Sequence, residues 1–445
     1  MTKFKAISLF FFLLVLTSCS IQTKAYKKLE KENEGTFQTW LRQNNEINYY
    51  SENLSLNEAV KISYTYNKKL LASNEKKYFA KAKVLESLYN FLPAIEPLGS
   101  YTYLDSHAKL QTNSGEIKVG KKENASFTLQ ATQPIFNGGA LLSGYRASRY
   151  GSFIVNENIL SGYQKLYFEV AKAYYDILLS RKLLEVFELS YKSAKEHYDE
   201  VKIKHENGLA SDYDLLRSEV EVTNFNANFI KQKNKVSIFK TTFSKLLGMN
   251  QDYQFNLENI LEFKDFQIEE KEIMKTSFLS RPDLKAKHFE VSVQKQMLNI
   301  ARSNYLPKIN FQAAQRWGAE DSNITTPDRW AKDLSARIFL KWDIFDFGNK
   351  RSKVRQQAAL LREKQYLLKD IKETIHLEVE QAILNLKDAI EFVNSQKLDL
   401  KRAKNALMLA QVGFKEGLKS QVELSDALLS MTNSQSLYYQ ALYQH

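Results

Sequence analysis

Residues 133–139 read QPIFNGG, and residues 342–348 read WDIFDFG. Both segments place a phenylalanine three positions before a glycine, and the second glycine lies 209 residues after the first. The residues upstream of each segment alternate between apolar and polar side chains, whereas those downstream repeat apolar side chains every three or four positions. This change of period from 2 to about 3.6 predicts that a β-strand ends and an α-helix begins at each segment.

The same offset recurs at the far end of each predicted helix. HENGLAS at 205–211 corresponds to FKEGLKS at 414–420, and upstream Pro93 corresponds to Pro307 at an offset of 214. In both copies 69 residues separate the glycine of the strand-to-helix joint from the glycine of the second motif. The chain is therefore predicted to be internally duplicated, with rigid segments of constant length and a length-tolerant loop in each copy.

Few residues interrupt the predicted helices. The chain has 445 residues with only 15 Gly and 6 Pro, and no Pro occurs between Pro134 and Pro282 or after Pro327. In the second copy a narrow apolar stripe of helical period consists of Ile371, Ile375, Val379, Ala382, Leu386, Ala389 and Val393. A helix that fills the 69-residue interval would be roughly 100 Å long, and such helices normally pack against others. A second helical pattern resumes shortly after Gly208 and Gly417, which predicts a tip where the chain reverses.

Two strands of about ten residues are predicted in each copy, one on each side of a polar loop. In the first copy Phe127 and Leu129 alternate with Thr128, and the polar loops lie at roughly 105 to 124 and 318 to 333. Strands of this length with one apolar face are typical of outer-membrane barrels, where the polar face lines water. A β-hairpin packed on soluble helices is the alternative interpretation.

The composition limits how such strands could occupy a membrane. The mean hydropathy is −0.43, and no apolar run of 18 residues follows the N-terminus, which excludes a helical membrane transporter. Four strands cannot close a barrel, because the smallest barrels need about eight. Open strand edges are not stable in lipid. If the strands span a membrane, other copies of the chain must therefore complete the barrel.

The N-terminus predicts export. Lys3 and Lys5 precede an apolar run, and Leu16-Thr17-Ser18-Cys19 resembles the bacterial lipobox, in which the cysteine is acylated. Cys19 is the only cysteine of the chain, so a disulfide scaffold is excluded. We expect a signal peptide at 1–18 and lipidation at Cys19; an ordinary signal peptide with an incidental cysteine is the alternative. By resemblance to enteric lipoproteins, Ser20 favours sorting to the outer membrane.

The signal, the two strand pairs with long helices, the Phe-x-x-Gly joints and the Gly-Leu tips resemble the TolC outer membrane efflux family over about residues 54–443. The resemblance implies a mixed fold, mostly α, in which each chain of a homotrimer gives four strands to one twelve-stranded barrel that continues into a long periplasmic helical barrel. It also implies a passive exit duct in the outer membrane, partnered by a periplasmic adaptor (membrane fusion) protein and an inner-membrane efflux transporter. The transported substrate does not follow from it.

Two other functions stay open. A type I protein-secretion duct is a variant within the same class, and a lipid-anchored helical scaffold without a pore is the alternative from another class. The expected segments are a signal peptide at 1–18, a lipidated tail at 19–53, a first repeat at 54–247, an equatorial linker at 248–274 and a second repeat at 275–445. The first repeat comprises a strand hairpin at 98–135, a long helix at 139–207 and a return helix at 212–247. The second comprises a hairpin at 308–345, a long helix at 348–416 and a return helix at 421–443.

The resemblance also assigns residues. A periplasmic gate would consist of Asp214 facing Lys419, with Glu423 and Asp426 as an acidic constriction; family members often have Tyr where Phe414 stands, so one hydrogen bond of the gate is missing here. The adaptor-docking tips would be Gly208, Leu209, Gly417 and Leu418. The strand-to-helix joints would be Phe136, Gly139, Phe345 and Gly348. Solvated helix ends and ordinary helix reversal are the simpler interpretation of the gate and tip residues.

The sequence contains no pattern expected of an enzyme or a metal site. The six His residues lack ligand spacing, and Lys122 follows Lys121 where a phosphate loop would need Ser or Thr. The formal net charge of +12 is spread among Asp and Glu along the helices, which argues against a nucleic-acid partner. We therefore expect no catalytic residues, metal or cofactor, and the energy for any transport must come from a partner.

Overall fold

The computed structural model describes residues 49–106, 108–112, 115–119, 123–249, 254–258, 261–264, 266, 269–319 and 330–445. The expected signal peptide at 1–18, Cys19 and nearly all of the expected tail lie outside these residues, as does most of the second polar loop.

The chain divides into two compact units, and each contains parts of both repeats. One unit comprises the described residues of 49–71, 164–266 and 384–445, and the other comprises those of 72–163 and 269–383. The divisions between the units fall after residues 163 and 383, within the two longest helices, and so do not coincide with the boundary between the repeats.

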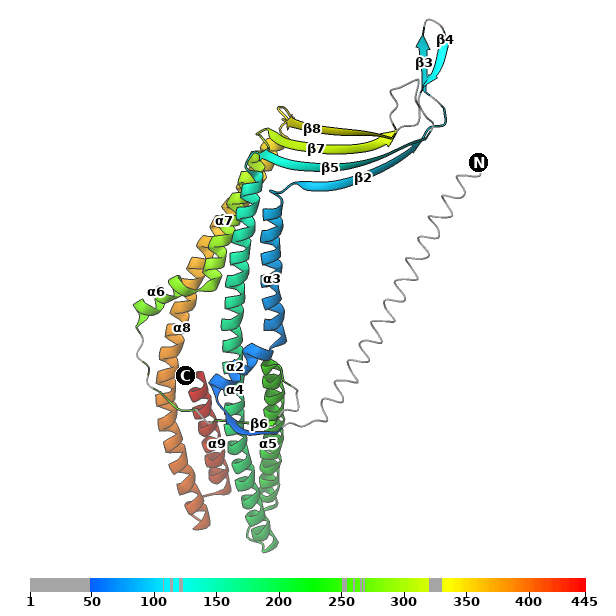
Figure 1. Cartoon of the computed structure of the whole chain (residues 1–445). Coiled ribbons are helices and arrows are strands. Elements are labelled where there is room, and N and C mark those ends of the chain that lie inside the picture. The colour runs from blue at the N-terminus through cyan, green and yellow to red at the C-terminus, as the bar shows by residue number, and fades with distance from the viewer. Residues whose placement is uncertain are drawn as a thin grey trace. The chain divides into compact units, whose positions relative to one another are not determined.

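Both repeats contain the same succession of helices (Figure 1), and all pairs except the return helices match in length. Helices α2 (Leu56–Tyr66) and α6 (Glu270–Ser280) have 11 residues each, and α3 (Lys68–Tyr89) and α7 (Pro282–Ser303) have 22 each. The long helices α4 (Ala140–Glu206) and α8 (Asn349–Lys415) have 67 residues each. The return helices are α5 (Asp212–Leu247) and α9 (Gln421–Gln444). No helix among the described residues has both the length and the apolar character needed to cross a membrane.

Four strands form one antiparallel sheet in the order β2-β5-β7-β8 (Figure 1). They are β2 (Ala94–Tyr103), β5 (Glu123–Asn137), β7 (Lys308–Ala319) and β8 (Trp330–Lys341). The first polar loop contains a further hairpin of β3 (Ala108–Thr112) and β4 (Gly115–Val119), and β4 begins at Gly115 with φ 121°. Strand β8 ends at Lys341, and the Trp342 indole donates to the Tyr305 carbonyl at 3.0 Å in the irregular segment that follows.

A second, smaller sheet lies in the segments expected to be a tail and a linker. Strand β1 (Tyr49–Leu54) pairs in parallel with β6 (Gln254–Leu257). The buried Tyr174 hydroxyl of α4 lies 3.0 Å from the Leu54 carbonyl and 2.9 Å from the Glu258 carbonyl, so α4 fixes the ends of both strands. Burial raises the pKa of Tyr174 to about 12, which keeps this hydroxyl protonated.

Apolar clusters between the helices form the cores of the two units. In one unit Ile375 and Val379 of α8 pack with Leu284 of α7. In the other unit Ala194 of α4 packs with Phe225 of α5 and Leu428 of α9. The first of these clusters uses the helical stripe predicted for α8, because residues three or four positions apart share one face of a helix.

Candidate functional site

One face of the four-stranded sheet is apolar and uncovered. Residues directly opposite each other in an antiparallel ladder point to the same face, so the register defines its rows. One row joins Pro97, Leu129, Gln315 and Leu334. The exposed large apolar side chains on this face are Ile95, Tyr101, Tyr103, Phe127, Leu129, Phe311, Leu334, Ile338 and Leu340. Leu334 is 73% exposed, which is far more than a face packed on soluble helices would allow.

The opposite face is predominantly polar, and Leu98 and Phe339 are its exposed large apolar side chains. One of its rows joins Thr132, Gln312 and Arg337, where the Arg337 guanidinium donates to the Gln312 amide oxygen. Ser100 and Ser126 share a hydrogen bond of 2.7 Å on the same face. The other polar residues of this face are Glu96, Thr102, Asn124, Thr128, Gln130, Lys308, Asn310, Arg316, Asp333, Ser335 and Lys341. The sheet therefore has the two-sided pattern of a strand set that separates lipid from water.

Both edges of this sheet are open among the described residues. Strand β2 pairs only with β5, and β8 pairs only with β7. An unpaired edge presents a row of backbone donors and acceptors that another strand can satisfy.

Phe136 stands at a bulge just before the first joint. The register shifts between Pro134 and Phe136, so that Phe136, not Ile135, lies opposite Ile309. Proline cannot donate to the ladder, which explains why the irregularity falls at this position. The regular alternation of faces along β5 therefore ends at Pro134, and Phe136 lies in the row of Ile309.

The two strand-to-helix joints share an unusual backbone. Gly139 and Gly348 have φ of 80° and 90°, in the left-handed region that favours glycine. The residues before them, Gly138 and Phe347, are left-handed too, with φ of 55° and 53°. Phe347 is 93% exposed and touches only the ring of Phe345 among described aromatic side chains, at 4.7 Å between centroids. The glycine pair of one joint is thus a strained Phe-Gly pair in the other.

Both tips close through the same backbone bonds. Gly208 and Gly417 are left-handed, with φ of 74° and 76°. The Leu209 amide donates to the Lys204 carbonyl at 2.8 Å, and Leu418 makes the corresponding bond at 2.7 Å. Such a bond together with a left-handed glycine is the Schellman motif that ends helices. Leu209 and Leu418 project from the turns with 79% and 80% of their surface exposed.

Two of the predicted gate carboxylates cap the helices that follow the tips. Asp214 accepts from the Ser211 hydroxyl at 2.7 Å, and the Asp214 amide donates back to that hydroxyl at 3.2 Å. Glu423 and Ser420 form the equivalent capping box at the start of α9. We did not predict these serines as site residues, although the Ser-x-x-Asp and Ser-x-x-Glu spacing is a recognisable signal.

Lys419 contacts Glu423 within the second tip. Its Nζ lies 2.5 Å from Glu423 Oε1, whereas the Asp214 carboxylate bonds to Ser211. The hydrogen bond from Lys419, together with the Ser420 amide, holds the pKa of Glu423 below its usual range. The structure thus brings together Lys419 and Glu423 rather than Lys419 and Asp214 within one chain.

Polar contacts join α5 to α9 behind the tips. They are Arg217 Nη2 to Asp426 Oδ1 at 3.9 Å, Gln421 Nε2 to the Asp214 carbonyl at 2.8 Å, and Ser425 Oγ to Glu221 Oε2 at 2.5 Å. Asp426 is largely exposed, so its ion pair with Arg217 is a weak contact in water. Of the two acidic residues expected at a constriction, Asp426 therefore contacts the neighbouring return helix α5, whereas Glu423 caps its own helix α9.

Phe414 joins α8 to α4 through its ring. Its centroid lies 5.0 Å from that of His197 in an edge-on arrangement, and Lys204 Nζ lies 4.2 Å from the Phe414 centroid. The second contact has the geometry of a cation–π interaction. His197 was not among the predicted site residues.

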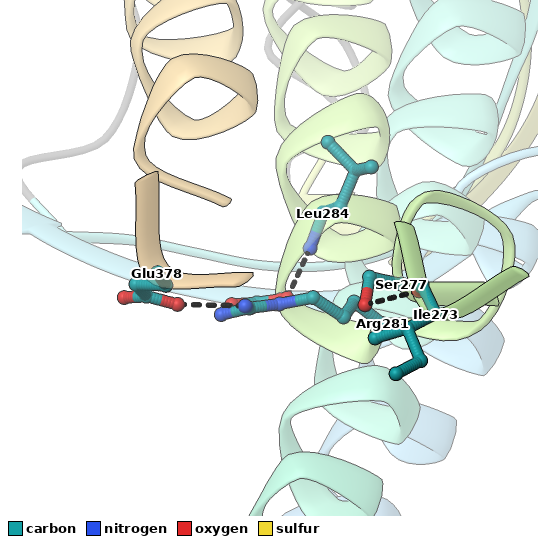
Figure 2. Close-up of polar contacts among 6 residues, drawn as sticks. Ile273, Ser277, Arg281, Leu284 and Glu378 are labelled. Atoms are coloured by element: carbon teal, nitrogen blue, oxygen red, sulfur yellow. Dashed lines mark hydrogen bonds and ion pairs between the residues drawn. The ribbon is translucent and has the colours of Figure 1, made fainter. Parts of the chain in front are cut away.

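A charged cluster fixes the bend between α6 and α7 to α8 (Figure 2). Arg281 Nη1 lies 2.6 Å from Glu378 Oε2, and Arg281 Nη2 lies 2.7 Å from Asp283 Oδ2. Asp283 also accepts from the Leu284 amide at 2.8 Å, and Ser277 donates to the Ile273 carbonyl at 2.9 Å. The hydrogen bonds from Arg281 hold the pKa of Asp283 below its usual range. This cluster was not predicted either.

The described part of the chain contains no group of three or more His, Cys, Asp or Glu residues placed to hold a metal ion. Its notable features are therefore a two-faced sheet with open edges, two matched helical tips and the polar contacts around them.

Comparison with known proteins identifies a family. The family described as "Outer membrane efflux protein" matches this chain over residues 69–249 and 274–445. The alkaline protease secretion protein AprF of Pseudomonas aeruginosa is 20% identical over 345 residues, which cover 75% of this chain and 70% of that protein. The outer membrane protein TolC of Vibrio cholerae is 21% identical over 274 residues, which cover 59% of this chain and 61% of that protein.

Solved structures share the fold. The CmeC outer membrane channel of Campylobacter jejuni superposes with a TM-score of 0.76 at 17% identity, covering 87% of this chain and 82% of that one. The outer membrane protein VceC of Vibrio cholerae has a TM-score of 0.74 at 13% identity, covering 87% and 92%. The likeness confirms the predicted fold class, a mostly α chain with an internal duplication and a four-stranded sheet.

Proposed function

The chain belongs to the outer membrane efflux protein family, and from this premise we propose that three copies form a channel that is the exit duct of a tripartite efflux pump. The family comprises passive channel proteins, not enzymes. Substrate would enter from an inner-membrane transporter and a periplasmic adaptor and leave to the exterior. The energy for this movement would come from the transporter.

The observation that carries the proposal is the sheet with two opposed faces and two open edges. Its apolar face, with Leu334 and Ile338 exposed, suits lipid, and its polar face, with Gln312 and Arg337, suits a water-filled lumen. One sheet of four strands cannot close on itself, because the smallest barrels need about eight strands. Joining β8 of one copy to β2 of the next would satisfy every edge in a closed ring of three.

The tips would form the periplasmic gate of the channel. The contact of Arg217 on α5 with Asp426 on α9 supports this role, because it joins neighbouring helices beside the tips. Lys419 and Glu423 form a second charged contact within the second tip. In a trimer, Asp426 would recur three times around the axis, and such an acidic ring attracts cations. Pairing of Asp214 with Lys419 between tips and the contribution of Phe414 belong to the same proposal.

The tip leucines would dock the adaptor. Leu209 and Leu418 expose apolar side chains at the turns that follow Gly208 and Gly417, and an exposed apolar side chain at a helix reversal can insert between helices of a partner. The proposal also includes lipidation at Cys19, which would anchor the chain to the outer membrane without spanning it.

One relative favours a second function within the same class. The name of AprF describes alkaline protease secretion, so this chain could instead be the duct of a type I protein-secretion system. Deleting the gene separates the two. Loss of a protein from the culture medium would support secretion, whereas increased susceptibility to toxic small molecules or metal ions would support efflux.

Recording the purified full-length protein in planar lipid bilayers tests the channel. We expect native mass spectrometry to give a trimer, and we expect discrete conductance that increases when Asp214 and Lys419 are both replaced by Ala. The control replaces Glu272 and Lys275, an exposed ion pair on α6 outside the tip, and should leave conductance unchanged. A protein that is monomeric and never conducts, even with the tip substitutions, would instead be a helical scaffold.

A further inference from the structure

His197 is a buried titratable side chain to which the proposed channel assigns no role. It lies on α4 with only 9% of its surface exposed. Neither Nδ1 nor Nε2 has a hydrogen-bond partner among the residues that the structure describes. A buried imidazole without a partner is costly, and its charged form costs far more. A position of this kind is expected to change its packing when the ring takes up a proton.

A polar cavity of about 270 Å³ lies beside His197 in the tip. Residues of α4, α5, α8 and α9 line it. Its charged lining residues are Glu196 and Glu200 of α4, Glu221 of α5 and Lys415 of α8, and α9 contributes only uncharged ones. A protonated imidazole that left its packed position would therefore meet carboxylates within the same cavity.

These carboxylates are not bonded to His197 in the structure. Glu200 Oε1 instead pairs with Lys204 Nζ at 3.0 Å, and Glu221 accepts from the Ser425 hydroxyl at 2.5 Å. Burial holds the pKa of His197 below its usual range; the charge of Glu200 opposes this effect, and the charge of Lys204 adds to it. The neutral ring is thus the form that fits the packed tip.

The packing partner of His197 is Phe414 of α8, so a change at His197 affects the contact between α4 and α8. Phe414 contacts His197 and also Lys204, whose Nζ lies 4.2 Å from the ring centroid. A proton on His197 would place a second cation close to Lys204 around the same ring, without a hydrogen-bond acceptor for either imidazole nitrogen. Moving the imidazolium toward Glu221 would give it a hydrogen-bond acceptor, but the movement would remove its edge-on contact with Phe414.

We propose that His197 is a proton-sensitive lock of the tip: its neutral ring holds Phe414 of α8 against α4, and protonation releases α8. The inference rests on the proposed function for its consequence, an acid-induced opening of the channel, but the lock itself is a local packing equilibrium. The proposed lock is also compatible with Phe rather than Tyr at position 414, because an apolar ring packs on a neutral imidazole without a hydrogen bond.

The direction of the pH effect follows from the proton balance. The released state has an ordinary imidazole pKa of about 6.5, whereas the packed state has a lower one. The packed tip is therefore fully favoured above about pH 6.5, and it loses stability as the pH falls below that value, because only the released state takes up the proton. Between the two pKa values, each pH unit shifts the equilibrium by up to about tenfold.

Hydrogen exchange of the full-length protein in detergent tests the lock. Amides of 193–204 and 407–418 are followed at pH 7.5 and pH 5.0, with labelling times scaled for the intrinsic exchange rate. In the wild type we expect protection of both segments to fall by about tenfold at pH 5.0. In His197→Phe and His197→Gln, which cannot titrate, protection should be independent of pH. The second variant guards against poor packing of the larger ring.

His205 supplies a matched control on the same helix. Its Nε2 lies 2.7 Å from Asp212 Oδ1 in an exposed contact across the first tip. His205→Gln should retain the full acid response of the wild type. An acid response that is absent in the wild type, that persists in both His197 variants, or that disappears in His205→Gln would overturn the proposal.

Conductance separates this proposal from the channel itself. Acid should raise the open probability of the wild-type channel in planar bilayers and should not do so in the His197 variants. If no variant conducts at any pH, the proposed channel is wrong, and the exchange measurement alone still decides whether His197 locks the tip.

Discussion

At the scale of the residue, the two strand-to-helix joints have the same left-handed backbone conformation but different residues at one position. At Gly138 a Cβ atom would lie 2.5 Å from the Ser303 carbonyl, so glycine is required there. Phe347 occupies the equivalent position with φ 53° although it has a Cβ. The repeat offset placed both residues at joints, but the alternation of apolar and polar side chains contains no information about the sign of φ.

Replacing Phe347 by Gly is therefore expected to stabilise the protein. A non-glycine residue in the left-handed region costs about 1 kcal/mol, and this exposed ring loses little burial when it is removed. Thermal unfolding in detergent should show a higher Tm for Phe347→Gly. Gly348→Ala, at φ 90° in open space, should lower Tm by a comparable amount. A Tm that is unchanged or lower in Phe347→Gly would show that the joint is not strained.

At the scale of the element, the long helices were the most predictable part of the chain. Their ends were expected at 207 and 416, and the structure has them at Glu206 and Lys415, because a Gly in the left-handed region follows a long periodic stripe. Strands β1 and β6 were not predicted, because their six and four residues are too few to show the alternation of a β-strand. Asp214 and Glu423 were predicted as gate residues, and that role stays a prediction; their bonds to Ser211 and Ser420 were not predicted, because the family resemblance implies contacts between tips rather than within one helix turn.

Ser211 and Ser420 should determine the stability of the first turn of each return helix. Ser211→Ala and Ser420→Ala remove the hydroxyl that caps the first turn of α5 and of α9, at a cost of about 1 kcal/mol each. We expect faster hydrogen exchange in the first turn of the affected helix and no change in the other repeat. Ser211→Asp and Ser420→Asp, which can also cap, should largely restore protection. Equal exchange in the Ala and Asp variants would argue against the caps.

Arg281 should fix the bend between α6 and α7 through its forked contacts. Arg281→Lys keeps the charge but cannot bond Asp283 and Glu378 in the same geometry, so we expect a cost of about 1 kcal/mol after allowance for partial exposure. Because Asp283 has a lowered pKa, its contribution is present above its usual pKa of about 4 and is lost as the pH falls through the lowered value.

Urea unfolding between pH 7 and pH 3 measures the cost of Arg281→Lys and the pH-dependent contribution of Asp283. The wild type should lose stability toward pH 3 more steeply than Asp283→Asn, which has no carboxyl group to protonate. A parallel pH dependence of the two proteins would show that Asp283 is not held by Arg281. Lys275→Arg on α6, whose ion pair with Glu272 is exposed, serves as the control and should not alter stability.

At the scale of the whole molecule, the duplication explains why the main sheet has four strands, and the apolar and polar faces of that sheet explain which surroundings the strands require. Each repeat supplies one hairpin, and β5 pairs with β7 to join the two hairpins into one sheet. The alternation of side chains predicted an apolar face, but only the register shows that both hairpins present it on the same side. Pairing between repeats depends on contacts far apart in the chain, which local periodicity does not encode.

Adjacent residues of β8 allow the membrane assignment to be tested with one variant and its control. Leu334 lies on the apolar face and Ser335 on the polar face, in consecutive rows of the ladder. Leu334→Arg would place a charge in lipid at a cost of about 2 to 4 kcal/mol near the bilayer centre, whereas Ser335→Arg would place it in the water-filled lumen. We therefore expect Leu334→Arg to reduce the yield of trimer in lipid vesicles by at least about tenfold and Ser335→Arg to leave it near the wild-type value. Equal yields from both variants would mean that the apolar face does not contact lipid, and a loss only in Ser335→Arg would mean that the faces are assigned the wrong way round.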